Sequence, residues 1–418
     1  MLSRLIGALV LAVSFSPIAR AQWPESMMPE TAGSSASQGV YAEDPMFSDA
    51  LPRDLSGLFG GPSRFWLTGE YLLGFTPSDS LPVLATSAPV GSFGTLGAAD
   101  TTVLIGGEQK FDSNSGFRFG GGLWLDSCRA YGVEWSFSLL PRQSKSYDFS
   151  GANSGVLARP FFDTALAVPN SRLVSSNGGF TGNLAATYDS LYWNLDVGGV
   201  VRVLETSEFS LEQTFHARHF SIEDRLRISD RSSSTGGTLF FNGGAVGDPT
   251  ASVAVSDSFT MLNRWYGGAA GLRINYNPGR FGLSVAVRLG VGASTQNLNI
   301  DGLTTLQTAS GTTAVAPGLL SASTGSITVK ETKLSYAPEV RIRASYQLTS
   351  RISATVGYEY LYISDIARLG SNIPTRLNPI NAPSSQNYLT TGTKATFGNL
   401  SQTDFWLHGL TVGLSLSF

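Results

Sequence analysis

The three histidines of this 418-residue chain are the side chains best suited to acid–base chemistry near neutral pH. His216 lies on the polar face of one alternating stretch, and Asp196 lies on the polar face of the stretch before it. If the hairpin between them centres near Thr206, they are cross-strand neighbours, and a carboxylate beside a histidine can orient a general base. Because no nucleophile is identifiable beside them, a hydrogen bond or ion pair is the favoured interpretation. The sequence therefore predicts no catalytic residue and no enzyme.

The other two histidines offer no metal site. His219 lies on the opposite face of its strand from His216, so the two do not converge on one ion. His408 falls beside Trp406, as expected for a pair at a membrane interface. The Gly120–Gly122 run lacks the lysine and the strand–helix context of a phosphate loop. No metal and no cofactor are predicted.

Most charged side chains occupy one face of alternating stretches whose other face is apolar. A charge on a lipid-exposed face costs about 2–4 kcal/mol near the middle of a bilayer, so these residues are predicted to point into a lumen. The predicted lumen-lining residues are Glu70, Arg118, Glu134, Asp196, Glu212, His216, Arg218, Arg273, Arg288, Glu339, Arg341, Arg343 and Glu359. Arg202 and Arg351 are assigned to the same face. The excess of arginine predicts a preference for anions if the lumen conducts.

The last stretch, Thr403 to Phe418, shows the period of a strand with one apolar face. Threonine, glycine and serine alternate with the apolar positions that we interpret as a C-terminal assembly signal, namely Leu410, Val412, Leu414, Leu416 and Phe418. The alternative is an ordinary terminal strand of a soluble sandwich. A lipid-facing strand better explains a terminal aromatic residue beside a row of aliphatic ones.

Nine further stretches alternate in the same way and must position the charged residues. They lie near residues 65–75, 116–125, 131–140, 191–197, 209–222, 270–276, 281–289, 334–346 and 352–360. Short turns follow the even-numbered stretches, and long loops follow the odd-numbered ones, at about 76–115, 141–187, 229–257, 300–330 and 366–402. This asymmetry predicts an all-β, antiparallel up-and-down transmembrane barrel of ten strands, with short periplasmic turns and long extracellular loops. Twelve strands is the alternative if 76–114 or 141–187 hides a hairpin.

The apolar set changes parity after His219, where Phe220 and Ile222 become the apolar residues. Such a change indicates either a β-bulge or the point at which the strand leaves the membrane. Barrels of eight strands are packed by side chains, whereas wide aqueous channels need about sixteen. Ten to twelve strands therefore favour a narrow, largely filled lumen.

Composition and the N-terminal region agree with an exported barrel. Charged residues make up 14% of the chain, against about a quarter in soluble domains, and the mean hydropathy is +0.05. Residues 1–21 are interpreted as a signal peptide, 22–62 as a flexible periplasmic lead-in and 63–418 as the barrel. Removal of residues 1–21 takes away Arg4 and Arg20 and changes the net charge from −3 to −5, which argues against nucleic-acid binding. Cys128 is the single cysteine, so no internal disulfide is expected.

Five stretches carry a family resemblance: Trp66–Leu73, Gly121–Asp126, Leu157–Phe161, Ala337–Val340 and Gly357–Tyr362. In this order they resemble the putative beta-barrel porin family, the seventh group of that label, over about residues 63–418. The resemblance implies an exported β-barrel in the outer membrane of a Gram-negative-type bacterium, reached by Sec-type export. It brings no catalytic or binding residues with it.

Three hypotheses on function follow. The first is a narrow porin-like channel for small solutes or ions, and the alternative is a non-conducting structural or adhesive barrel that acts through its extracellular loops. The third and least favoured is a barrel hydrolase that uses His216. The expected partners are outer-membrane lipid and, through the C-terminal strand, the barrel-assembly machinery. No nucleic acid is expected, and a homo-oligomer is left open.

Overall fold

The computed structural model describes residues 64–151 and 155–418. The predicted signal peptide (1–21) and lead-in (22–62) therefore lie outside the described residues. Strands dominate the described part. Its helical elements are three short 3₁₀ helices, η2 (Leu320–Ser323), η3 (Gly370–Asn372) and η4 (Pro379–Asn381). No helix in this part of the chain has the length and apolarity needed to cross a membrane.

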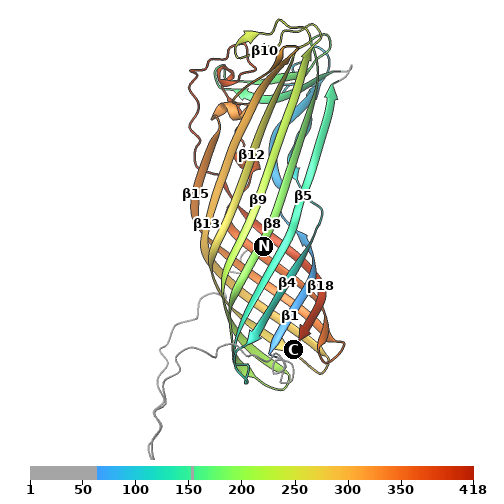
Figure 1. Ribbon diagram of the computed structural model, residues 1–418, viewed down its shortest axis with the longest axis vertical. Helices are drawn as coiled ribbons and strands as arrows, with labels where there is room; N and C mark the ends of the chain where they lie inside the picture. The colour runs from blue at the N-terminus through green and yellow to red at the C-terminus, as the bar shows by residue number, and fades with distance from the viewer. Residues whose placement is uncertain (1–63, 152–154) are drawn as a thin grey trace, which may run out of the picture. The chain divides into compact units, whose positions relative to one another are not determined.

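Ten antiparallel strands close into a ring (Figure 1). Each strand pairs with the next, and the last pairs with the first; the order around the ring is β1 (Phe65–Phe75), β4 (Asn114–Trp124), β5 (Tyr131–Gly151), β8 (Phe180–Glu205), β9 (Phe209–Ser234), β12 (Ser252–Tyr276), β13 (Phe281–Thr308), β15 (Ile327–Gln347), β16 (Ile352–Ala367) and β18 (Gln402–Ser417). The predicted ten-stranded up-and-down barrel is thus confirmed.

The short turns lie together at one end of the ring, which we call the short-turn end. β1 and β18 close the ring there: the Phe418 amide donates to the Phe65 carbonyl at 2.8 Å, and the two aromatic rings lie 6.4 Å apart. The alternating apolar residues of β18 point outward, since Leu410, Val412 and Leu414 are about half exposed. An outward apolar face is the face that contacts lipid in a membrane barrel.

The predicted long loops are wrong over much of their length, because the strands continue through them. β5 runs on to Gly151, β8 begins at Phe180, and β13 reaches Thr308. Past His219 the β8–β9 register shows no shift, so the change of parity marks the membrane boundary and not a bulge. The outward positions become polar there, which ends the lipid-facing pattern but leaves the strand intact.

The segments predicted to hide extra hairpins do contain them, but these hairpins do not join the ring. They form a second sheet in the order β17 (Arg376–Leu377), β6 (Val156–Asp163), β2 (Asp79–Ala88) and β3 (Thr102–Gln109), with β7 (Val168–Ser175) also paired to β6. The alternative of twelve barrel strands is therefore wrong. Three smaller strands complete the described fold: β10 (Phe240–Phe241), β11 (Gly244–Ala245) and β14 (Gly311–Val315).

Beyond the membrane boundary the ring opens into a six-stranded sheet. The pairing of β4 with β5 ends at Leu139, and the pairing of β15 with β16 ends at Glu339, whereas β5, β8, β9, β12, β13 and β15 continue. In Figure 1 these long strands extend far past β1, β4 and β18. We call this extension, together with the second sheet and the 3₁₀ helices, the head.

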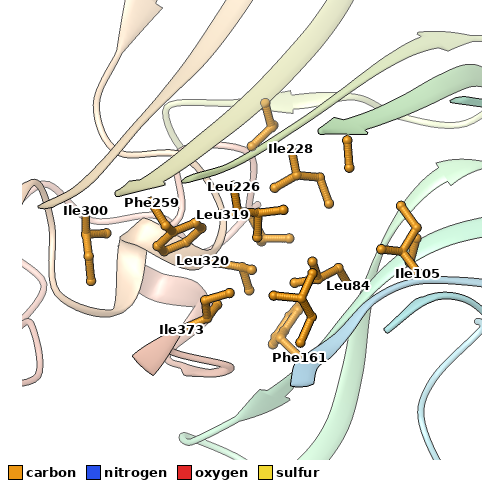
Figure 2. Packing of buried hydrophobic residues seen from close by; sticks show 14 of the residues in the cluster. Leu84, Ile105, Phe161, Leu226, Ile228, Phe259, Ile300, Leu319, Leu320 and Ile373 are labelled. Carbon is orange, nitrogen blue, oxygen red and sulfur yellow. The ribbon is translucent and has the colours of Figure 1, made fainter. Parts of the chain in front are cut away.

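The head has an apolar core of its own. Leu226, Ile228 and Phe259 point inward from the long strands and are at most 1% exposed. They meet Leu84 and Phe161 of the second sheet, as Figure 2 shows. Each such side chain contributes about 1.5–3 kcal/mol when it is fully buried, so this core fixes the second sheet to the inner face of the long strands.

Candidate functional site: the lumen and its closure

The predicted lumen residues come from nine strands of the ring and meet inside it. Glu70, Asp196, Arg218, Glu339 and Glu359 are at most 4% exposed, although their strands have a lipid-facing side. Arg273, Arg341 and Arg343 are partly exposed. Burial of so many charges requires that they pair, because an isolated buried charge is very costly.

One part of the network is centred on Arg218 and Arg341. Arg218 contacts Asp196 at 2.6 Å and Glu339 at 2.7 Å. Arg341 contacts Glu339, Asp196 and Glu359. Asp196 and Glu339 therefore each contact two guanidinium groups, and the shared contacts tie different walls of the barrel together.

A second part is centred on Glu134. Its Oε1 atom lies 2.5 Å from Arg273, 3.2 Å from Arg288 and 3.0 Å from His216 Nε2. Arg273 also reaches Glu212 at 3.2 Å. Two guanidinium groups and one histidine thus share one carboxylate.

A third part joins Arg118 to the first. Arg118 contacts Glu70 at 3.4 Å and also contacts Glu359, while Arg343 reaches Glu70 at 2.8 Å. All thirteen predicted residues therefore take part in ion pairs or histidine–carboxylate contacts inside the barrel. We call the thirteen together the ion-pair layer.

The predicted pairing of His216 with Asp196 is wrong. Asp196 lies directly opposite Arg218, and His216 lies opposite Gly198. The ladder between β8 and β9 centres on Ser207, one residue beyond Thr206, so each residue of β8 faces a partner two residues later on β9 than expected. His216 therefore lies against Glu134 of β5 and not against the carboxylate expected.

The two other arginines assigned to the lumen behave differently. Arg202 contacts Glu212 at 3.1 Å and stacks over Trp124 at 4.5 Å, so it does lie at the inner face. Arg351 is exposed in the turn before β16, and its assignment to the lumen is wrong. Strand parity does not extend into a turn, so it misplaces the residue.

Apolar side chains close the lumen directly above the ion-pair layer, on the side of the head. These side chains point inward from positions nearer the head than the ion-pair layer, and we call them the septum. The septum consists of Leu72, Leu140, Tyr192, Phe220, Ile222, Trp265, Ala337, Leu361, Ile363, Ile366, Phe405 and Leu407. None is more than 4% exposed. The sequence carried a signal for them, because Leu72, Phe220 and Leu361 each follow a lumen charge by two residues.

Two glycines make room for the largest septum residue. A Cβ atom on Gly267 would lie 2.4 Å from the indole ring of Trp265, and one on Gly292 would lie 2.7 Å from it. Both distances are far below a normal carbon–carbon contact. The ring therefore lies flat against the wall because neither neighbour has a side chain.

A cavity lies on the other side of the ion-pair layer, at the short-turn end. It has a volume of about 360 Å³ and is lined by Arg202, Arg273, Arg288 and Arg343, with Trp66 and Trp124 nearer the strand ends. We call it the vestibule. The ion-pair layer and the septum separate it from the head.

Outward-facing aromatic side chains mark the level at which the strands leave the membrane. His219 lies between Trp193 and Tyr266, with ring centroids 4.7 and 4.4 Å away. His408 lies 4.9 Å from the Trp406 ring, and its Nδ1 atom is 2.5 Å from Tyr358 Oη. Aromatic belts of this kind sit at the two interfaces of membrane proteins. Among the described residues, no group of His, Cys, Asp and Glu side chains could hold a metal ion.

Several solved structures are similar to this chain at low scores. The outer membrane protease OmpT from Escherichia coli has 11% identity and a TM-score of 0.36, with 85% of this chain and 97% of that chain covered. The Pseudomonas putida toluene transporter TodX has 8% identity and a TM-score of 0.27, with 87% and 93% covered. The anion-selective porin from Comamonas acidovorans has 12% identity and a TM-score of 0.18, with 84% and 100% covered. These scores are too low to transfer any activity.

No curated protein matches the chain. The model of the family described as Putative beta barrel porin-7 matches residues 66–418, which include almost the whole described part. The closed ring of ten strands, the apolar outer face and the aromatic belt agree with that match. The chain belongs to the Putative beta barrel porin-7 family and is a β-barrel of the outer membrane.

Proposed function

We propose that this protein is a closed outer-membrane barrel that holds an ordered extracellular head and acts through that head. The observation that carries the proposal is the septum, which lies across the lumen above a layer of paired charges. In an outer-membrane barrel the short turns face the periplasm, so the head faces outward. The barrel then serves as an anchor.

Ion movement through this arrangement is strongly disfavoured. A hydrated ion would have to shed its water among Trp265, Phe405 and Leu407, which are at most 2% exposed and offer few polar groups. Hydrophobic constrictions block permeation in this way by excluding water. Transfer of an ionised group into such surroundings costs many kcal/mol.

Planar-bilayer recording of the chain without residues 1–21 tests the proposal. We expect a folded, heat-modifiable barrel that inserts into the bilayer and shows no discrete conductance steps at any voltage. Trp265→Ala combined with Phe405→Ala should then produce small steps, because the septum is thinned. Steps of similar size in the unmodified protein would overturn the proposal.

A narrow porin-like channel is the second candidate. The family description as a porin and the arginine-lined vestibule support it. In that case the unmodified protein conducts, and Arg341→Glu changes its ion selectivity, because it reverses a charge in the ion-pair layer. Unchanged selectivity in Arg341→Glu would count against this candidate.

We also propose that the protein is not an enzyme. The Nε2 atom of His216 lies 3.0 Å from a carboxylate oxygen of Glu134, and its Nδ1 atom has no hydrogen-bond partner among the described residues. The ring therefore activates no hydroxyl or thiol in this arrangement. Equal peptidase and esterase background in the parent and in His216→Ala would agree. Loss of a measurable activity in the variant would contradict the proposal.

The C-terminal strand is proposed to be recognised during assembly. Leu410, Val412 and Leu414 form an outward apolar row that ends beside the pairing of Phe65 and Phe418. Phe418→Asp should lower the amount of folded barrel in the outer membrane without changing the amount exported, as a protease-protection assay would measure. An equal amount of folded variant would contradict recognition at this position.

A further inference from the structure

Some arginine donors at the vestibule have no partner among the described residues, although each of these arginines makes an ion pair. Arg288 is 5% exposed, and its ion pair in the described part of the chain is one 3.2 Å contact with Glu134, which Arg273 and His216 share. Its Nε and Nη1 atoms have no hydrogen-bond partner there. A buried donor without a protein partner requires an explanation, and an ion or ligand that accepts its hydrogen bond is one such explanation.

Arg343 adds donors that are exposed to the cavity. It contacts Glu70 at 2.8 Å, and its side chain is 35% exposed toward the same cavity. Arg202 lines the cavity as well, and its buried Nε atom has no partner among the described residues. Six arginines and two glutamates line the cavity, while the carboxylates that pair with Arg118, Arg341 and Arg343 are not part of the lining. A guanidinium fork binds planar or tetrahedral oxyanions through two donors at once.

The vestibule also has polar side chains without charge. Hydroxyl and amide side chains ring it at the ends of the strands, namely Ser210, Asn275, Asn277, Ser284, Ser345, Ser353 and Ser415. Such groups donate to and accept from hydroxyl groups. The volume of about 360 Å³ is at the lower end of the range for small-molecule pockets and exceeds the needs of a bare inorganic ion.

We propose that the vestibule binds a small hydroxylated oxyanion from the periplasmic side, with Arg288 and Arg343 on the oxyanion and the serine and asparagine ring on the hydroxyl groups. Sugar phosphates are the chemical class that fits both parts. The site is separate from the head, so it gives the barrel a periplasmic binding activity of its own.

Isothermal titration of the detergent-refolded chain without residues 1–21 tests this, with glucose 6-phosphate, inorganic phosphate and glucose as probes. We expect saturable one-to-one binding of glucose 6-phosphate, weaker binding of phosphate because the polar ring stays empty, and no binding of glucose. Arg288→Gln should weaken glucose 6-phosphate binding at least about tenfold, the effect of one lost charge-assisted contact. Arg343→Gln should do the same to a smaller extent, and it provides the test if Arg288→Gln does not fold.

Arg280→Gln is the matched control, because it removes the same charge from an exposed turn at the same end of the barrel. It should leave binding unchanged. Absence of binding by both anions, or binding that neither vestibule variant weakens, would overturn the proposal. Equal affinity for phosphate and glucose 6-phosphate would overturn the role of the polar ring. The titration does not depend on conductance, so a conducting barrel would defeat the closed-barrel function and leave this site standing.

Discussion

The membrane half of the barrel and the head are built from the same strands, but their polar and apolar faces are exchanged: the membrane half is apolar outside and charged inside, and the head is polar outside and mainly apolar inside. On β9, Phe215 points outward and is 48% exposed, while Arg218 points inward and is 3% exposed. Ten residues further on, Ile228 points inward at 1% exposure and Arg227 points outward. Strand parity is unchanged between them. Outside the wall, lipid is replaced by water, so the outward side chains change from apolar to polar.

The two halves are consequently held together by different forces. In the membrane half the interior is held by the ion pairs of the ion-pair layer. In the head the interior is an apolar core pinned by a few buried ion pairs. Arg159 of β6 contacts Asp230 at 3.0 Å and Asp257 at 2.5 Å, and Arg368 contacts Asp224 at 2.7 Å.

The largest expected effect comes from breaking the ion-pair layer. Arg218→Met would leave Asp196 and Glu339 with less compensation and should lower the free energy of unfolding by about 3–5 kcal/mol. Denaturant unfolding in detergent measures it. Arg142→Met is the control on the outer surface, where the pair with Glu223 is partly solvent-exposed and worth about 0–1 kcal/mol. Equal losses in the two variants would refute the difference between lumen and surface.

The exchange of inside and outside can be tested directly with one new charge in each half. Val287, outward in the membrane half, is 54% exposed, and Val287→Arg should cost about 2–4 kcal/mol because the charge meets lipid. Ser229 is outward in the head, and Ser229→Arg should change stability by no more than about 0.5 kcal/mol. Unfolding in lipid vesicles measures both. A cost in the head equal to that at Val287 would show that the membrane boundary lies elsewhere.

The smallest expected effect is a pH-dependent change in the stability of the head, which comes from one buried carboxyl group. Burial, and then Asp224, raise the pKa of Asp79 in the head above its ordinary value of 3.8, although Arg368 and the Gly370 amide lower it. A raised carboxyl pKa stabilises the fold fully below the ordinary value, and the contribution is lost as the pH rises through the raised one. Asp79→Asn resembles the protonated form and should raise the Tm of the head by about 2 °C at pH 7.5.

Near-ultraviolet circular dichroism of the whole refolded protein on heating measures this change in Tm. The amide oxygen introduced by Asp79→Asn can still accept from the Gly370 amide and from Tyr188 Oη, as the Asp79 carboxylate does at 2.9 and 3.2 Å. The difference between the variant and the parent should shrink at pH 4. A variant that is less stable than the parent at pH 7.5 would show that the charge of Asp79 supports Arg368 more than its burial costs.

The sequence alone was sufficient for the ten strands, because each has a lipid-facing row such as Leu410, Val412 and Leu414 that repeats every second residue. It was insufficient for the head. There the inward rows mix Asp224 and Asp230 with Leu226 and Ile228, and Ser- and Gly-rich stretches look like loops although they are paired strands. Partners such as Arg159 and Asp257 are 98 residues apart, so no local period relates them.

The alternation along each strand was sufficient to predict which residues face the lumen, but not which of them contact one another. Parity placed the charges of the lumen on one face, but it could not say that His216 meets Glu134 and not Asp196, since that depends on the residue at which the β8–β9 hairpin centres. It also could not show the septum, because an apolar residue such as Trp265 on a polar face looks like an irregularity until the ring closes around it.

The continuity of the long strands has a mechanical consequence. β8, β9, β12, β13 and β15 run from the short-turn end through the membrane boundary into the head, and their mutual register does not shift at that level. A pull on the head along the strands loads their ladders in shear, so many hydrogen bonds must fail together before the chain extends. The head is therefore a direct continuation of the barrel wall, and a force applied to it along the strands is carried by the membrane-embedded part of the same strands.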